Sequence, residues 1–531
     1  MTTALSSTGK LFLHRRRRAA SAGAVVATAP PRKSDRQIAR WLLISLACAF
    51  TALVARVGEV THDAFHEMAL FREFITSGRF PIADVFAYTP TVNPSVHHEW
   101  GTGALLYLAT VGTGWGLGGL TALKIARMRG VHPYLFCLLA ITVFPMLWVG
   151  FATIRATLFT LLCVGIQLWM HERDRRGHRL WLLGWWCMLV VWLNLHAGFV
   201  VGIGLLGLHA AERFCTQVWH SRSLRTAVRS TWHLMLALPL TVLALPINPY
   251  GWQYVPYLTK AITMPRPRIT EWLPLWHTHD PVFTLLMFCL SLAWIALAVR
   301  GQRGRDLLGL LGLSVCALLA LKHLRHGSIY SVLWIAYVPA WLTHTSLGHD
   351  IVRRIQACPR LSLRLSQAIS AALLMWSAAY GFGATSLSGD LSRQSTCYPI
   401  EATRYLAEHR FSGNLLTPFH AGAYVSWRLS PKVKVSLDGR YEVAYEPPVF
   451  EEHWEFFEGG AEWARLLDKY PHDAILVHQS AKVRPLLKVF RDPGCTHLPT
   501  RQRWRFAYED DAYIILTRPA IKLPYEDHRA P

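Results

Sequence analysis

The stretch WLLISLACAFTALVARVGEVTHDAFHEMALFREFITSG, residues 41–78, decides the fold. Its first part, residues 41–57, is apolar and close to the length of about 20 residues that crosses the hydrocarbon core of a bilayer. Its second part begins near Asp63 and places apolar side chains along one side of a helix. The stretch therefore predicts a chain that crosses a membrane and continues as an amphipathic helix at its surface.

Apolar stretches of this kind recur along the chain. Hydrophobic residues make up 52% of the 531 residues and 22 residues are Trp, which is more apolar side chain than the cores of a soluble protein need. Inside lipid the backbone must pair its own N–H and C=O groups, so we expect helices. The sequence predicts an α-helical polytopic membrane protein with about eleven spans. Their expected positions are 41–57, 102–122, 132–150, 156–170, 180–194, 198–212, 231–247, 281–299, 307–322, 328–345 and 366–385.

Lys and Arg indicate which span ends face the cytoplasm. The formal net charge is +22, and the basic runs, beginning with Arg15 to Arg18, fall in alternate loops. Loops rich in Lys and Arg stay inside, so residues 1–40 are expected to form a basic cytoplasmic tail. With an odd number of spans the C-terminus lies in the periplasm, and the chain lies in the inner (plasma) membrane of a bacterium. Because this charge sits beside span ends without a recognition motif, nucleic acid is not an expected partner.

The chain divides into three parts at changes of composition. After the tail, residues 41–388 form the multi-spanning domain, with an outward loop at 58–101, and residues 389–531 form a soluble domain. In the soluble domain charge rises and long apolar runs end, and helical patterns alternate with strand-like runs, which is typical of an α/β fold. The helical patterns cover 400–409 and 460–470, and the strand patterns cover 433–437, 474–477 and 512–517.

Two features of the soluble domain have alternative interpretations. LDGRYE at 437–442 follows a strand, so Asp438 and Arg440 lie where α/β sites form, but an Asp-Gly turn with an internal ion pair is the favoured interpretation. Cys397 and Cys495 both lie in the outward domain, where thiols are oxidised, and a disulfide between them is a hypothesis.

The outward loop at 58–101 opens on the amphipathic helix. Its apolar stripe consists of Phe65, Met68, Phe71 and Ile75, while Glu67, Arg72 and Glu73 point elsewhere. Gly78 and Pro81 signal the end of the helix. We expect the apolar stripe to lie on the membrane surface.

Three carboxylates in this loop are candidate catalytic groups: Asp63, Asp84 and Glu99. Transfer of a sugar from a lipid phosphate needs a base for the incoming hydroxyl, and a carboxylate in a partly dry cleft can have its pKa raised for that task. Asp63 is our choice for the base. The alternative is that Asp63 and Glu99 only cap helices at the water boundary.

A leaving phosphate needs positive charge, and polar groups at the outward span ends could supply it or bind a sugar. The alternatives are that Arg155 only extends to the interface and that Asn194 and His196 satisfy a helix break next to Gly198. The candidate substrate-binding residues are Arg155, Asn194, His196, Lys322, Arg325 and His326.

A divalent metal ion is the one cofactor that the loop suggests. His97, His98 and Glu99 could hold such an ion, with Asp63 or Asp84 completing the set. The alternative is that the two histidines are ordinary surface residues.

Around these residues the sequence resembles the GT-C superfamily of multi-spanning glycosyltransferases that use polyprenyl-phosphate sugars. It is more closely similar to bacterial membrane proteins grouped with the dolichyl-phosphate-mannose protein mannosyltransferases, over roughly residues 40–345. The resemblance rests on Asp63 with its helix and on ADVFAYT (83–89), HHEW (97–100), IRATLFT (154–160), NLHAGFVVG (194–202), NPYG (248–251) and EWLPL (271–275).

The resemblance implies an acidic catalytic residue in the first outward loop, a role that falls on Asp63, with Asp84 or Glu99 as a second carboxylate. The adjacent acidic pair common in the mannosyltransferases is absent here, because His62 precedes Asp63 and Ala64 follows it.

The leading hypothesis is a membrane glycosyltransferase that moves a sugar from a polyprenyl-phosphate carrier to an acceptor glycan, lipid or protein on the periplasmic face. Two other classes stay open. One is a transporter or flippase of a lipid-linked saccharide, although we find little of the internal symmetry such proteins show. The other is a non-enzymatic assembly or sensor protein whose periplasmic domain binds a partner.

Overall fold

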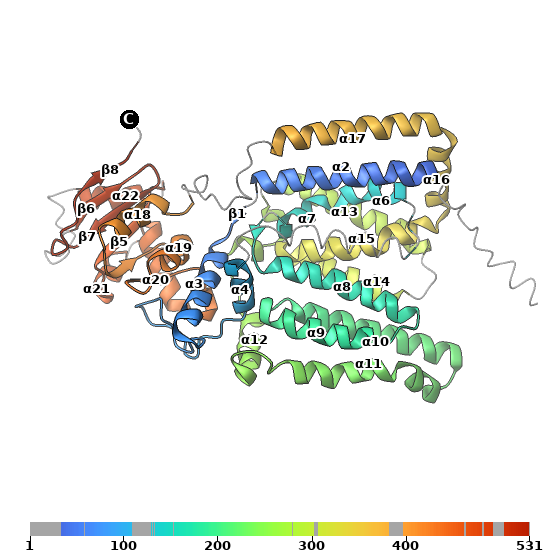
Figure 1. The fold of residues 1–531 in the computed structure, drawn as a ribbon, viewed down its shortest axis with the longest axis horizontal. Coiled ribbons are helices and arrows are strands. Elements are labelled where there is room, and N and C mark those ends of the chain that lie inside the picture. Colours follow the sequence, from blue (N-terminus) through green and yellow to red (C-terminus); the bar gives the residue numbers. More distant parts are fainter. Residues whose placement is uncertain are drawn as a thin grey trace, which may run out of the picture.

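A computed structural model of the protein shows a bundle of long helices with a smaller α/β region at one end (Figure 1). It describes residues 33–57, 59–108, 129, 131, 133–151, 153–278, 280–301, 306–381, 397–460, 463–480, 483–491 and 504–529. Most of the predicted tail (1–40) and most of the predicted span at 102–122 therefore lie outside the described residues, as does Cys495, so the proposed disulfide stays a prediction.

Most of the bundle helices run side by side along the long axis of Figure 1, and a described helix covers at least part of every predicted span. One span is shared by α6 and α7, which a short 3-10 turn, η1 (Ile141–Val143), joins. The bundle helices are α2 (Lys33–Val57), α4 (Trp100–Leu108), α6 (Pro133–Ala140), α7 (Phe144–Phe151), α8 (Thr157–Arg175), α9 (Trp181–Leu195), α10 (Phe199–Ser221), α11 (Leu224–Ala244), α13 (Pro281–Ala298), α14 (Leu307–Lys322), α15 (Gly327–Thr343) and α17 (Pro359–Gly381).

Three of the described helices, α10, α11 and α13, are long and apolar enough to cross a membrane by length and composition. Other helices, such as α9 and α14, are apolar but shorter. The helical bundle is thus observed, and the number of eleven spans stays a prediction.

Helix α15 forms the centre of the bundle. All of its residues are buried, and its sequence is accordingly apolar on every side, as expected for a helix enclosed by others. Its polar side chains have partners inside the bundle: the Tyr330 and Ser291 hydroxyls lie 2.7 Å apart, and the Trp334 indole N–H donates to the Ser291 carbonyl at 3.1 Å. Helix α15 is therefore the central helix against which the surrounding helices of the bundle pack.

The C-terminal region contains a six-stranded mixed sheet with the strand order β4-β3-β5-β7-β6-β8. The predicted strands appear as β4 (Val433–Val435), β5 (Ala474–His478) and β7 (Tyr513–Thr517), and the predicted helices as α18 (Ile400–Glu408) and the shorter α21 (Arg465–Lys469). The sequence patterns missed β3 (Gly413–Leu416), β6 (Arg505–Glu509), β8 (Glu526–Asp527), α19 (Phe419–Leu429), α20 (Pro447–Glu458) and α22 (Arg484–Arg491).

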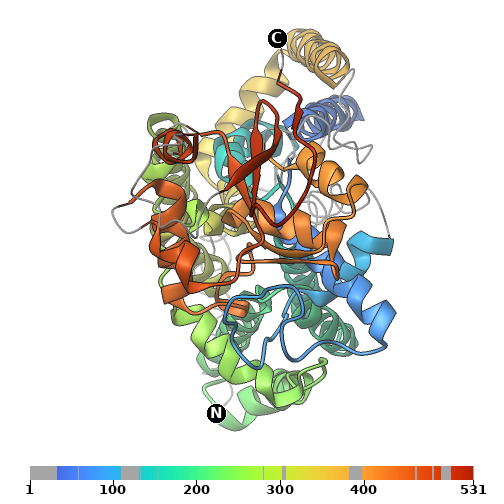
Figure 2. The same cartoon turned by 90° about the vertical axis from the view of Figure 1, so that its left-hand side faces the viewer.

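The loop between α3 and α4 is joined to this sheet. Its residue Ala87 forms a parallel bridge with Val435 of the edge strand β4, with hydrogen bonds from Tyr88 N–H to the Val435 carbonyl (3.1 Å) and from Val435 N–H to the Phe86 carbonyl (3.0 Å). Figure 2, which looks along the bundle from this end, shows the loop and the C-terminal region lying together over the helix ends. The loop thereby covers a sheet edge that would otherwise expose unpaired backbone groups.

The amphipathic helix α3 (His62–Ser77) ends where Gly78 adopts φ 75° and donates its N–H to the Phe74 carbonyl. Its apolar stripe was expected to lie on the membrane, but Phe65 packs on Tyr398 and Tyr424 of the C-terminal region, with ring centres 4.9 and 5.1 Å apart. The expectation for Phe65 is therefore wrong, because a folded partner from the other end of the chain covers this side of the helix.

Candidate active site

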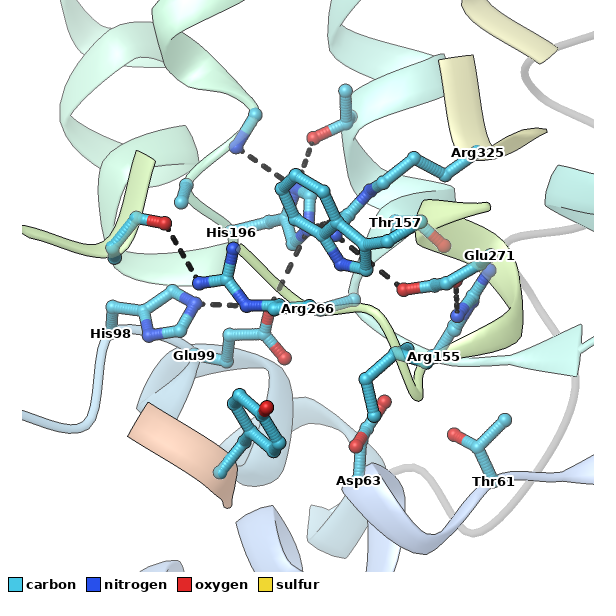
Figure 3. A pocket seen from close by; sticks show the side chains of 18 of the residues that line it. Thr61, Asp63, His98, Glu99, Arg155, Thr157, His196, Arg266, Glu271 and Arg325 are labelled. Atoms are coloured by element: carbon cyan, nitrogen blue, oxygen red, sulfur yellow. Dashed lines mark hydrogen bonds and ion pairs between the residues drawn. The ribbon is translucent and has the colours of Figure 1, made fainter. Parts of the chain in front are cut away.

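A cavity of about 910 Å³ lies where the bundle meets the C-terminal region. One wall comes from the ends of α8, α10 and α14, another from the loops before α13 and α15, and a third from α3. The C-terminal region closes it with Gly439, Arg440 and Tyr441 of the LDGRYE motif and with Val443 directly after the motif. Most of the sequence-predicted site residues line this single space. Figure 3 labels Asp63, His98, Glu99, Arg155, His196 and Arg325 among them.

A two-stranded parallel sheet brings the first two charged residues together. Strands β1 (Glu59–Val60) and β2 (Thr153–Ile154) pair in register, so both chains leave this small sheet at the same edge. Asp63 follows β1 and Arg155 follows β2 directly. Two residues about ninety positions apart in the chain therefore face one cavity (Figure 3).

Asp63 lies at the first turn of α3 with 35% of its side-chain surface open, and it lines the cavity. Its Oδ1 lies 3.3 Å from His62 Nε2. Burial raises the pKa of Asp63; His62 and Arg155 oppose this change, the carboxylates of Glu99 and Glu271 add to it, and the result is a raised pKa. The direction of this shift is the one that a general base requires.

Glu99 is held by two imidazoles. Its Oε1 lies 3.3 Å from His98 Nε2 and 3.4 Å from His196 Nε2. Burial alone would raise the pKa of Glu99, but the hydrogen bond and charge of His98, together with His196 and Arg325, lower it overall. The pKa of Glu99 is therefore shifted in the opposite direction to that of Asp63, and Glu99 is ionised.

A hydrogen-bond chain sets the tautomer of His196. The Trp192 indole N–H donates to the Thr160 hydroxyl at 2.9 Å, and that hydroxyl lies 2.7 Å from His196 Nδ1. The Gly198 backbone N–H also donates to this Nδ1, at 3.0 Å. Nδ1 is thus an acceptor, so the ring proton sits on Nε2 and points at Glu99. Burial lowers the pKa of His196 to about 3, which keeps the ring neutral.

Two arginines flank a carboxylate on the opposite wall. Glu271, in η3 (Thr270–Trp272), pairs with Arg155 and lies 3.4 Å from Arg325 Nη1. Burial would raise the pKa of Glu271, but the two arginines lower it to about 2. With one carboxylate between two guanidinium groups, this cluster keeps a net positive charge. The EWLPL motif contains Glu271, but no pattern in it predicted this role.

The cavity lining contains two more residues that the sequence predicted for substrate binding. Lys322 lies at the end of α14, and His326 lies in η6 (Leu324–His326). Lys322 has no ion pair or hydrogen bond within the part of the chain that the structure describes. Burial lowers the pKa of His326 to about 4, and its Nδ1 is buried without a hydrogen-bond partner among the described residues. The lysine therefore offers a free positive charge, whereas the histidine is neutral.

Two of the candidate residues lie outside the cavity lining. The buried carboxylate of Asp84 is paired with Arg440 and accepts hydrogen bonds from the backbone N–H groups of Phe86 and Ala87. Asn194 accepts from the Trp100 indole and donates to two backbone carbonyls, those of Val190 and Ile247. These contacts match the structural alternative for Asn194 and tie Asp84 to the C-terminal region.

The two histidines proposed as metal ligands point to different partners. His97 is buried with Nδ1 3.4 Å from His66 Nε2, and burial lowers its pKa to about 3. His98 faces Glu99 and the Tyr257 hydroxyl, which lies 2.8 Å from its Nδ1. Among the described residues no three His, Cys, Asp or Glu side chains are placed to hold a metal ion together.

Among the comparisons with known proteins, the comparison with solved structures bears on the fold. The sequence matches no protein-family model and no curated protein. The structure, however, is similar to the crystal structure of ArnT from Cupriavidus metallidurans in the apo state, with a TM-score of 0.50, 14% identity, and coverage of 90% of this chain and 97% of that one. The structure of the same protein bound to undecaprenyl phosphate gives a TM-score of 0.49 and 16% identity over the same shares of the two chains. This chain therefore shares the overall fold of that protein over most of its length.

Proposed function

We propose that the chain transfers a sugar from a polyprenyl-phosphate carrier to an acceptor hydroxyl, at the membrane face that carries the C-terminal region. The observation that carries this proposal is the composition of the cavity. Asp63, with a raised pKa, lines the same space as Arg155, Arg325 and Lys322. A base and a set of cations are the two requirements of transfer from a phosphate leaving group.

The transfer follows from this arrangement. Asp63 accepts the proton of the acceptor hydroxyl, and the hydroxyl oxygen forms a bond to the anomeric carbon of the sugar. The bond from that carbon to the phosphate oxygen breaks, and its electron pair stays on the phosphate. Arg155, Arg325 and Lys322 stabilise the charge that develops there. Glu99, oriented by His98 and His196, raises the pKa of Asp63 and so favours proton uptake.

The lining also has an apolar portion suited to a lipid. Leu258, Ile262, Leu319 and Ile329 line the cavity beside the charged residues. An apolar wall next to cations suits an amphiphile with an anionic head and an isoprenoid chain. The resemblance of the sequence to the GT-C superfamily supports the same class of substrate.

The test measures sugar transfer by the purified full-length protein from a labelled undecaprenyl-phosphate sugar. Asp63→Asn keeps the shape of the side chain but removes the base, so we expect a loss of about 10²- to 10⁴-fold. Glu73→Gln, on the same helix but outside the cavity lining, is the matched control and should keep wild-type turnover. Equal turnover of Asp63→Asn and wild type would reject the base.

The pH dependence gives a second readout. The base must be ionised, so the rate should rise with pH and level off above the pKa of Asp63. Because that pKa is raised, the midpoint should lie above the ordinary aspartate value of 3.8. A rate that stays flat from pH 4 to pH 8 would contradict this assignment.

A further inference from the structure

Glu67 is a buried carboxyl of the cavity that the proposed transfer does not use. It lies one helical turn after Asp63 on α3, so both side chains lie on one side of the helix. It is 7% exposed and lines the cavity. Its Oε2 is buried without a hydrogen-bond partner, and no residue that the structure describes forms an ion pair with it. A buried polar group of this kind has lost its hydrogen bonds to water and has gained no protein partner in exchange.

Helix α4 packs closely against α3 at Glu67. A Cβ at Gly103 would lie 2.1 Å from the Glu67 carbonyl oxygen. The contact of α3 with α4 therefore positions the backbone from which the Glu67 side chain reaches the cavity. An unpartnered buried group beside a cavity indicates a partner that arrives with the ligand.

The surroundings of Glu67 determine its protonation. It is faced by the carboxylates of Glu99 and Asp63 and by Arg440, whose charge is already bound by Asp84 and Asp438. The charge of Glu67 also affects Tyr250, and the buried rings of His66 and His97, which line the same cavity, have lowered pKa values and are neutral. Burial, with Glu99 and Asp63 adding to it, raises the pKa of Glu67 well above its ordinary value. These surroundings therefore favour the protonated, neutral form of Glu67.

We propose that Glu67 is a further catalytic residue, which donates the hydrogen bond of its carboxylic acid to an oxygen of the phosphate group bound in the cavity. The proposal rests on the proposed function for the nature of the ligand. A neutral acid can donate to an anionic oxygen, which is the strongest kind of acceptor, without adding a third negative charge to Asp63 and Glu99. No covalent bond forms or breaks at Glu67.

Infrared spectroscopy tests the protonation directly. Purified full-length protein at pH 7 should show a C=O band of a protonated carboxylic acid that disappears in Glu67→Gln and persists in Glu73→Gln. Addition of undecaprenyl phosphate should shift this band as the O–H group acquires an acceptor. Identical spectra of wild type and Glu67→Gln, or a band that undecaprenyl phosphate leaves unmoved, would overturn the proposal.

Binding of undecaprenyl phosphate gives an independent measure. A hydrogen bond to a charged group corresponds to an affinity loss of about 10- to 100-fold when it is removed, which we expect for Glu67→Ala. Glu67→Gln keeps an N–H donor and should bind within a few-fold of wild type, which separates loss of the donor from loss of the fold. Equal affinity of Glu67→Ala and wild type would contradict the proposal.

The two proposals fail separately. If Asp63→Asn keeps wild-type transfer while the Glu67 band responds to undecaprenyl phosphate, the base assignment is wrong and the role of Glu67 stands. If Asp63→Asn is inactive and the band is absent at neutral pH, the transfer stands and Glu67 does not donate.

Discussion

At the scale of single residues, the site depends on how closely two chain segments approach each other. His196 has an extended backbone after α9, with φ −166° and ψ 141°, and its ring lies against Thr160 and the backbone N–H of Gly198. A Cβ at Gly198 would lie 2.2 Å from Thr160 Oγ1 and 2.7 Å from His196 Nδ1. Gly198 is therefore required by the close approach, since any side chain there would displace the imidazole that holds Glu99.

We expect Gly198→Ala to disrupt the site. The added methyl group must push Thr160 or His196 aside, which weakens one of the two imidazole contacts of Glu99 and costs about 1–3 kcal/mol of stability from overpacking. The thermal unfolding temperature in detergent should fall, and sugar transfer should fall with it.

Gly204→Ala is the matched control on the same helix, because no atom lies within 4 Å of a Cβ at that position. Alanine favours a helix by about 1 kcal/mol over glycine, so this variant should be as stable as wild type or more stable. If the two variants unfold at the same temperature, the close contact at Gly198 does not constrain the site.

At the scale of elements, the outward loop and the C-terminal region behave as one unit. Arg440 is buried and binds both Asp438, at 2.8 Å, and Asp84 of the loop. Arg72 of α3 donates to the carbonyls of Ser426 and Trp427 near the end of α19, where helix carbonyls lack partners. The LDGRYE turn therefore contains the predicted internal ion pair and, through Asp84, a second pair that holds the loop over the cavity.

This second pair could not be predicted from the sequence, because Asp84 and Arg440 are 356 positions apart. The ion pair of Glu271 with Arg155 and the proximity of Glu67 to Glu99 could not be predicted either, because in each case the two residues come from different elements. Asp63 was predictable because its signal is local: an acidic residue between a span and an amphipathic helix. The helices were predictable for the same reason, since each needs only its own apolar run.

Removal of the Asp84 carboxylate should weaken the attachment of the outward loop to the C-terminal region. In Asp84→Ala the buried Arg440 keeps Asp438 but loses its second partner, so we expect a loss of about 3 kcal/mol, the lower end for an unpaired buried ion. Amide hydrogen exchange should accelerate in residues 84–92, and the protein should unfold at a lower temperature.

The control for this change is Lys260→Ala, which removes an exposed pair with Glu446, 3.4 Å apart, between the bundle and the C-terminal region. Exposed pairs contribute no more than about 1 kcal/mol, so exchange in the loop should be close to wild type. If both variants accelerate exchange equally, the Asp84 pair is not what holds the loop.

At the scale of the whole molecule, charged residues gather at both ends of the bundle but are organised differently. The end that carries the C-terminal region has the cavity. At the other end, Asp306 binds Arg129 (2.8 Å) and Arg175 (2.9 Å), and Arg175 also binds Glu212 (2.7 Å). These pairs join the start of α14 to the end of α8 and, through Glu212, to α10. Basic residues that the sequence assigned to cytoplasmic loops thus also hold the helices together.

The orientation of the bundle in the membrane is still a prediction, and two native cysteines can test it. Cys397 is exposed at the start of the C-terminal region, and Cys358 is exposed after α16 (Ser346–Ala357), at the opposite end of the bundle in Figure 1. The distribution of Lys and Arg places the first outside and the second inside. A membrane-impermeant thiol reagent should therefore label Cys397 in intact cells and Cys358 only after the membrane is opened.

The labelling is best performed in a Cys495→Ser background, so that neither a disulfide nor a second thiol obscures Cys397. Label on intact cells should then disappear in Cys397→Ser, and the label gained on opening the membrane should decrease in Cys358→Ser. The reverse pattern would place α3, the loop and the cavity in the cytoplasm. Because the pairs from Asp84 and Arg72 fix the loop to the C-terminal region, these elements must share one side, and the proposed transfer must take place wherever Cys397 is labelled.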